Sequence, residues 1–254
     1  MRYALISDIH ANLPALDAVL ADIDARGDAD AIYHLGDLVG YAPWPNDVVA
    51  RLQDRGIPGV AGNYDSTVAT DYKHCGCRYE DPRQEELSHV SFAWTRERVS
   101  PDTKRFLGAL PFRIDIRPLG GHVAGPTMHL LHGNQTLNTV YVTEDRSDEF
   151  LAKMGQGVGA AKNDVVAFGH THKPWQREVD GVLYVNTGSV GRPKDGDARA
   201  GYVLLDVSST GTDIEFRRVE YDVERAAAAI IESTLPNEFA EYLRTGGRST
   251  AAAQ

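Results

Sequence analysis

Acidic, amide and imidazole side chains follow predicted strands at several points of this 254-residue sequence. Asp8 and His10 stand two positions apart just after the apolar segment 3–7, and residues i and i+2 of extended backbone point the same way. Asp37 follows a second predicted strand, and Asn63 follows a third. Each of these residues alone is typical of a turn. Their recurrence favours ligands, because open α/β sheets bind ligands at the carboxyl ends of strands.

Three histidines continue this pattern in the second half of the chain. His132 follows the predicted strand 128–131, and His170 and His172 follow the predicted strand 165–168 within Gly-His-Thr-His. A lone histidine is usually a core or surface residue, although histidine is also the commonest metal ligand. Possible ligands follow five predicted strands, which is more than turn or core residues would produce by chance. Together the two carboxylates, four imidazoles and one amide predict a metal centre.

The same residues lie in five sequence blocks that resemble those of the calcineurin-like metallophosphoesterase family. The blocks are Asp-x-His, Gly-Asp, Gly-Asn-x-(Asp/Glu), a lone His and Gly-His-x-His, and all occur here in this order between Asp8 and His172. The resemblance covers about two thirds of the chain. It implies an α/β fold in which two packed mixed β-sheets are flanked by helices, a four-layer sandwich with its metals at the strand ends.

The resemblance also implies how two metal ions are held. It assigns Asp8, His10 and His172 to the first ion and Asn63, His132 and His170 to the second, with Asp37 bridging both. Two divalent ions against two carboxylates leave about two positive charges, which attract an anionic phosphate. Ions roughly 3.5 to 4 Å apart lower the pKa of a bridging water. We therefore expect a metal-bridging hydroxide as the nucleophile.

Two residues next to Asn63 bear on catalysis. Tyr64 stands where the better-known phosphatases of the family have a histidine near the leaving group. Tyrosine, with a pKa of about 10, shuttles protons poorly near pH 7, so poor alcohol leaving groups should be hydrolysed slowly. Tyr64 can equally be a packing residue. Asp65 either orients a metal-bound histidine as a hydrogen-bond acceptor or caps a turn. The candidate catalytic residues are Asp37, Asn63, Tyr64 and Asp65.

Substrate contacts are predicted for Asn63 and Arg192. Arg192 lies in the loop 186–193, which resembles the family's substrate-side loop, and its guanidinium can grip phosphate or remain a solvated loop residue. Cys75 and Cys77 are too close in sequence for an ordinary disulfide, so we expect free thiols. With His74 they are too few for a closed third metal site.

Hydrophobic periodicity indicates alternating strands and helices in the first third of the chain, which implies a parallel sheet covered by helices. The expected elements are strand 3–7, a helix capped by Asn12 and ended by Gly27, strand 31–35, helix 47–52 and strand 57–61. Residues 66–110 lack strand signals and contain a predicted helix at 84–98. We interpret them as a cap-like excursion that shapes the substrate pocket. Strands are then expected at 112–116, 128–131, 165–168, 182–185, 202–207 and 214–219, followed by helices at 223–232 and 237–243.

Composition is that of an ordinary globular protein, with 42% hydrophobic and 24% charged residues. We expect one domain at 1–244 and a flexible tail at 245–254. No stretch approaches the roughly 20 apolar residues of a membrane span, and the N-terminus has no signal-peptide pattern, so we expect a cytoplasmic protein without a membrane partner. A net charge of −10 makes long nucleic acid an unfavourable partner without excluding it. The oligomeric state is not predicted.

The predicted function is hydrolysis of a small phosphorylated substrate by a dinuclear metal centre. The resemblance to the family's small bacterial and archaeal phosphodiesterase branch favours cyclic nucleotides or other small diesters. A phosphomonoesterase, such as a protein serine/threonine phosphatase, and a dinucleoside polyphosphate hydrolase are the alternatives, and a non-catalytic interaction scaffold is the alternative of a different class. The ligand set suits Mn²⁺, our first choice, with Fe, Zn²⁺ or Ni²⁺ as alternatives.

Overall fold

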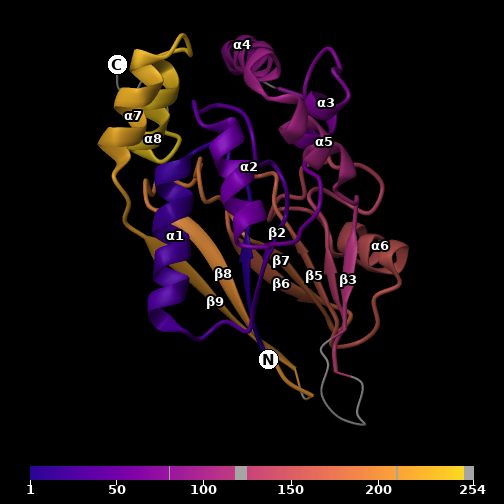
Figure 1. The fold of residues 1–254 in the computed structure, drawn as a ribbon. Helices are drawn as coiled ribbons and strands as arrows, with labels where there is room; N and C mark the ends of the chain where they lie inside the picture. Colours follow the sequence, from indigo (N-terminus) through magenta and orange to yellow (C-terminus); the bar gives the residue numbers. More distant parts are fainter. Residues whose placement is uncertain (80, 118–124, 210, 249–254) are drawn as a thin grey trace.

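A computed structural model describes residues 1–79, 81–117, 125–209 and 211–248, which form two mixed β-sheets between layers of helices (Figure 1). In these residues the strands are β1 (Arg2–Ile6), β2 (Ala31–His34), β3 (Ile114–Ile116), β4 (Met128–Leu130), β5 (Val165–Phe168), β6 (Trp175–Val179), β7 (Val182–Asn186), β8 (Ala200–Val207) and β9 (Thr212–Val219). The first sheet has the order β2-β1-β8-β9, and the second has the order β3-β4-β5-β7-β6.

Each sheet combines parallel and antiparallel neighbours. In the first, β1 runs parallel to β2, with Leu5 opposite Tyr33, and antiparallel to β8. In the second, β4, β5 and β7 are parallel, and the edge strands β3 and β6 run antiparallel to their neighbours. This confirms the predicted pair of mixed sheets. The parallel arrangement expected for the first third of the chain holds between β1 and β2, and β8 returns from late in the sequence to add an antiparallel neighbour to β1.

Alternate residues of the strands fill the space between the two sheets. Tyr3 and Leu5 of β1 share one buried cluster with Val165 of β5, whereas Ala4 and Ile6 contribute to the core beneath the helices. This period of two is what a strand requires when different layers cover its two faces. The sandwich interior therefore fixes the register that brings the strand ends together.

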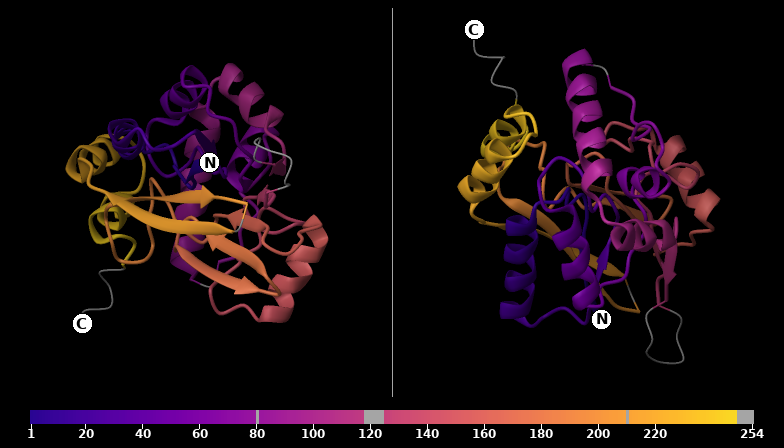
Figure 2. Two further views of the ribbon diagram at one scale, coloured as in Figure 1. Left: turned by 90° about the horizontal axis from the view of Figure 1, so that it is seen from below. Right: turned by 45° about the horizontal axis from the view of Figure 1, so that its top comes forward.

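Helices form the outer layers. Those that cover the first sheet and the helix that covers the second lie on opposite sides of the sandwich (Figure 2). They are α1 (Leu13–Arg26), α2 (Pro45–Asp54), α3 (Asn63–Ala69), α4 (Pro82–Arg98), α5 (Pro101–Ala109), α6 (Asp148–Val158), α7 (Val223–Glu232) and α8 (Glu238–Thr245). All of them except α6 share a core with the first sheet, and α6 packs on the outer face of the second. The α3–α5 group gathers at one end, next to α2 (Figure 1).

Helix α1 begins and ends as predicted. The Asn12 side chain accepts a hydrogen bond from the backbone N–H of Ala15, and Gly27 adopts a φ of 60° at the C-terminal end. That left-handed conformation suits glycine, which has no Cβ. Asn12 also donates to the carbonyl of Gly191, so the cap ties the helix to a loop that borders the candidate site.

The predicted strand 57–61 is wrong. A single bridge joins His34 to Gly59, and the segment is otherwise irregular in the described structure. A Cβ on Gly59 would lie 2.1 Å from the His34 carbonyl oxygen, so the two backbones meet too closely for any other residue. The segment still runs beside β2 and delivers Asn63 to the same edge of the sheet.

Four elements were not predicted, namely α3, α5, α6 and β6. Two glycines, Gly155 and Gly157, interrupt the helical pattern of α6, and β6 is a short edge strand. The excursion 66–110 contains most of α3 and all of α4 and α5.

The C-terminal segment is described as far as Arg248. Helix α8 includes Thr245, and the carbonyl of Gly246 accepts a hydrogen bond from Gly196. The rest of the predicted flexible tail, 249–254, lies outside the described residues. Among the helices that the structure describes, none has the length and apolar character needed to cross a bilayer.

Candidate metal centre

The predicted ligands gather where the strands of the two sheets end, although they come from distant parts of the sequence. Two buried groups of possible metal ligands result: Asp8, His10 and His172 in one, and Asp37, His132 and His170 in the other. The seventh predicted ligand, Asn63, is the first residue of α3 and lies beside the second group. The structure thus divides the residues as the family resemblance implies.

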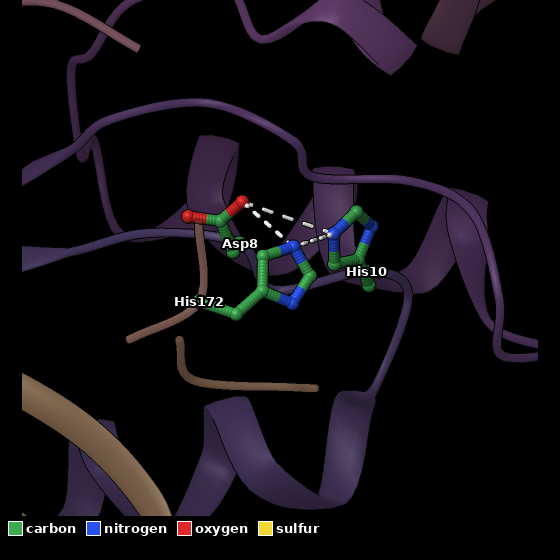
Figure 3. A group of neighbouring side chains, drawn as sticks. All are labelled: Asp8, His10 and His172. Atoms are coloured by element: carbon green, nitrogen blue, oxygen red, sulfur yellow. Dashed lines mark hydrogen bonds and ion pairs between the residues drawn. The ribbon is translucent and has the colours of Figure 1, made fainter. Parts of the chain in front are cut away.

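The first group points its polar atoms at one small region (Figure 3). His172 Nε2 lies 3.2 Å from Asp8 Oδ1 and 3.1 Å from His10 Nε2. Asp8 Oδ1 is buried and has no hydrogen-bond partner among the described residues. A buried carboxylate oxygen is unfavourable without a compensating partner, and a divalent cation would supply one. This donor set therefore fits a metal ion.

The second group has the same character and includes an amide oxygen. His132 Nε2 lies 3.2 Å from His170 Nδ1, 3.1 Å from Asn63 Oδ1 and 3.5 Å from Asp37 Oδ2. The same Asp37 oxygen is 3.8 Å from His10 Nε2 of the first group. Asp37 thus lies between the two groups, which is the position that a bridging carboxylate would need.

Backbone carbonyls orient three of the histidines. Nδ1 of His10 lies 3.1 Å from the Val39 oxygen, and Nδ1 of His132 lies 2.7 Å from the Leu35 oxygen. His172 makes the same contact with the Arg192 oxygen at 2.6 Å. A proton on Nδ1 leaves the Nε2 lone pair free to ligate, so these contacts select the tautomer that a metal requires. Sequence analysis missed these partners because any residue type can supply a carbonyl.

The second oxygen of each carboxylate is held by the protein. Asp8 Oδ2 accepts hydrogen bonds from Ser7 Oγ at 2.6 Å and from the His170 N–H at 3.0 Å. Asp37 Oδ1 accepts from the Tyr64 N–H at 2.9 Å. A Cβ on Gly62 would lie 2.1 Å from this Asp37 oxygen. The glycine of the Gly-Asn block thus serves close approach to Asp37 rather than a turn.

The backbone at the ligands is unusual. Left-handed φ values, between 49° and 67°, occur at Asp8, His10, Asp37, His170 and His172. Such values are uncommon for residues other than glycine and cluster at functional sites. The extended backbone expected at Asp8 and His10 is therefore wrong. The two side chains meet because the chain turns sharply after β1.

Burial keeps most of the imidazoles neutral. It lowers the pKa of His10 to about 3 and places the pKa values of His170 and His172 well below the ordinary histidine value. Burial also acts to lower the pKa of His132, but the Asp37 carboxylate outweighs it and raises that pKa to about 9. In the metal-free protein, a proton on His132 therefore occupies part of the space that a cation would take.

The structure favours the packing interpretation of Tyr64. Its side chain is fully buried against the rings of His10, Tyr41 and Phe92, and its hydroxyl lies 3.1 Å from Ser88 Oγ in α4. Burial raises its pKa well above the usual tyrosine value, so it is a poor proton donor. The hydroxyl thus contacts a residue of the helical layer.

Asp65 caps backbone groups instead of orienting a histidine. Its carboxylate accepts the N–H groups of Leu38 and Gly62, both at 2.9 Å. Burial, together with the neighbouring Asp37 carboxylate, raises the pKa of Asp65 to about 7. Of the two roles that the sequence left open, the turn cap is the one that these contacts support.

Arg192 lies in a cavity of about 320 Å³ next to the ligands, which we call the inner cavity. Its guanidinium carbon lies 4.0 Å from the ring centre of Tyr41, and the rings of Phe239 and Tyr242 are within 6 Å. The side chain is buried, and its Nε has no partner among the described residues. A buried cation without a carboxylate partner can accept an anion from outside.

Both cysteines are free thiols, as predicted. Cys75 is buried near the Tyr79 hydroxyl, and Cys77 Sγ lies 3.1 Å from the side-chain amide nitrogen of Asn63. This contact directs the Asn63 oxygen toward His132. Within the described residues, His74 and the two cysteines do not form a group of metal ligands.

Comparisons with known proteins agree with this geometry. The model of the calcineurin-like phosphoesterase superfamily domain matches residues 1–210. An uncharacterized protein of Methanocaldococcus jannaschii is 30% identical over 96% of this chain and 97% of its own length. The phosphodiesterase YfcE of Escherichia coli K12 is 26% identical over 81% of this chain and 88% of its own. The crystal structure of a metallophosphoesterase from Sphaerobacter thermophilus is 27% identical, has a TM-score of 0.72 and covers 97% of this chain and 99% of that chain.

Proposed function

The chain belongs to the calcineurin-like phosphoesterase superfamily, and we propose that it is a two-metal phosphodiesterase that hydrolyses cyclic nucleotides or other small phosphodiesters. The observation that carries the proposal is the pair of buried ligand groups joined by Asp37. In each group two imidazole nitrogens face each other about 3 Å apart, and Nδ1 of three rings is turned toward a carbonyl. This arrangement would suit cations bound by the facing nitrogens.

In this proposal Asp8, His10 and His172 would hold one divalent ion, Asn63, His132 and His170 would hold the other, and Asp37 would be shared by the two. When bound, such a pair of ions activates water as the nucleophile and stabilises charge on the phosphoryl oxygens. Mixed nitrogen and oxygen ligation suits Mn²⁺ best, with Fe, Zn²⁺ or Ni²⁺ as alternatives.

The protein's own contribution is to hold the substrate and to keep the ligands in place. Arg192 would bind a phosphoryl oxygen, because its buried guanidinium packs against aromatic rings and forms no ion pair with a carboxylate among the described residues. The Asn63 oxygen is fixed by the contacts of its amide nitrogen with Cys77 and with the Cys75 carbonyl. Groups fixed in advance need no reorganisation when the reaction occurs, and this preorganisation is the main source of electrostatic catalysis.

The preference for diesters has two supports. Sequence similarity connects the chain to a relative named a phosphodiesterase. In addition, Tyr64 stands where an acid for the leaving group would be needed, and its buried hydroxyl, with a pKa well above the usual tyrosine value, contacts Ser88 of α4. Without that acid, good leaving groups should be favoured. The net charge of −10 disfavours long polyanions, so we also propose a small substrate. The cytoplasmic location expected from the sequence stays part of the proposal.

The test compares bis-p-nitrophenyl phosphate with p-nitrophenyl phosphate on metal-free protein that is reloaded separately with Mn²⁺, Zn²⁺, Ni²⁺ or Mg²⁺. We expect turnover that depends on the metal, is fastest with Mn²⁺ and favours the diester. His172→Ala should abolish this turnover, whereas His89→Ala, at an exposed position on α4, should not change it.

Two results would overturn the proposal in different ways. A preference for the monoester would replace the phosphodiesterase with the alternative phosphatase. Binding of two ions without turnover of either ester would favour a protein-interaction scaffold.

A further inference from the structure

A second cavity, of about 1060 Å³, opens beside the inner cavity, and we call it the outer cleft. The two cavities share lining residues, among them Tyr79, Tyr141 and Lys194. The Tyr141 ring stacks on the His170 ring at 4.2 Å, so the outer cleft borders the metal ligands. Its volume is that of a site for a whole small molecule rather than for a single phosphate.

Four cations line the outer cleft: Arg78, Arg146, Lys173 and Lys194. Within the part of the chain that the structure describes, none of them forms an ion pair with a carboxylate. The nearby Arg83 on α4, by contrast, pairs with Glu86 and Glu238. Unpaired cations on one cavity of a chain with net charge −10 indicate a local positive field.

Among the described residues, two carboxylates, Asp81 and Asp145, line the cleft beside the four cations, so the lining keeps a net charge of about two positive units. Asp81 accepts the Arg83 N–H at 2.9 Å and caps α4. Asp145 accepts a hydrogen bond from the Thr143 hydroxyl. The guanidinium and ammonium groups therefore remain available to a ligand.

Arg146 is already held in place. Its Nε and one Nη donate to the Tyr141 carbonyl at 3.2 and 3.0 Å, and its guanidinium lies 5.0 Å from the ring centre of Phe150. The other Nη has no partner among the described residues. A donor that is positioned before binding loses less conformational entropy when it meets an anion.

We infer that the outer cleft binds a second anionic group of the substrate, of the phosphate class, while the scissile diester lies at the metal centre. This inference rests on the proposed function. The metal ions and Arg192 already compensate the charge of the scissile phosphate, and the cations of the outer cleft are additional to them. The Lys194 N–H donates to the His172 carbonyl at 3.3 Å, so this residue connects the two sites.

The test uses two substrates with the same scissile diester and the same leaving group. They are thymidine 5′-(4-nitrophenyl phosphate) and its 3′-phosphorylated counterpart, assayed with the Mn²⁺-loaded protein. We expect kcat/KM to be about tenfold higher for the 3′-phosphorylated ester, on the scale of two partly exposed ion pairs. The gain should lie in KM, because the distal phosphate binds equally in the ground state and the transition state.

The double variant Arg78→Ala/Arg146→Ala should bring the ratio of the two kcat/KM values close to one. The matched control is Arg105→Ala, since Arg105 is exposed on α5, pairs with Asp102 and lies outside both cavities. This control should keep the wild-type ratio. Raising the salt concentration should shrink the advantage of the 3′-phosphate in the wild type.

Binding gives a readout that is independent of turnover. Calorimetry should show that thymidine 3′,5′-bisphosphate binds about tenfold more tightly than thymidine 5′-monophosphate, and that the double variant loses this difference. Equal binding of the two nucleotides, or an unchanged ratio in the double variant, would overturn the second anion site. Hydrolysis of both esters at equal rates would do so while leaving the proposed function intact. If neither ester were hydrolysed but the bisphosphate still bound preferentially, the proposed function would be overturned and the second anion site would stand.

Discussion

The metal centre and the outer cleft lie side by side and are built in opposite ways. The candidate ligands of the metal centre are buried, follow strand ends and are held by neighbouring backbone groups. Cations of the outer cleft are carried by loops, and Arg78, Arg146 and Lys173 among them are exposed. Chemistry that tolerates little movement is thus placed on the rigid sheets, whereas recognition is left to segments that can vary between relatives.

The strongest test of this contrast removes the carboxylate that joins the two ligand groups. Asp37→Ala should lower metal-dependent diesterase activity by on the order of a thousandfold or more, because both ions lose a shared ligand. Metal content by mass spectrometry and activity on bis-p-nitrophenyl phosphate are the measurements. Asp102→Ala, at an exposed position on α5, is the matched control. A variant that kept both ions and full activity would show that Asp37 does not bridge them.

The two regions should also respond differently to pH. Below pH 9 the metal-free protein carries a proton on His132, because Asp37 raises that pKa to about 9, and a metal ion must displace this proton. Mn²⁺ affinity should therefore rise about tenfold per pH unit, or about a hundredfold from pH 6 to pH 8. The already neutral His10, His170 and His172 release no proton in this range.

Calorimetry in buffers of different ionisation enthalpy measures the protons that are released. We expect at least about one proton per chain at pH 7, mainly from His132 and in part from Asp65, whose pKa of about 7 would fall when a cation joins the neighbouring Asp37. The advantage of a distal phosphate should depend on salt instead, since the guanidinium groups of Arg78 and Arg146 stay charged throughout. Mn²⁺ affinity that did not change with pH would remove His132 from the ligand set.

The contrast also explains what the sequence could and could not predict. The residues that gather at the candidate metal centre could be picked out because Asp, Asn and His recur at the ends of apolar segments, and this pattern held even where the predicted strand 57–61 was wrong. The carbonyl partners of the histidines and the left-handed backbone leave no mark in residue type. The cleft cations belong to segments without periodicity, so only the fold could bring Arg78 and Arg146 together.

Tyr64 follows the candidate ligand Asn63 directly in the sequence, and its role can be tested as either packing or catalysis. Because its hydroxyl contacts Ser88 in the helical layer, Tyr64→Phe should leave kcat on the diester within about twofold of wild type. The loss of a buried hydrogen bond should lower the free energy of unfolding by about 1 kcal/mol, which urea unfolding of the metal-free protein would measure. A large fall in kcat with unchanged stability would mean that the hydroxyl reaches the substrate. Tyr64 would then belong to the catalytic centre and not to the packing around it.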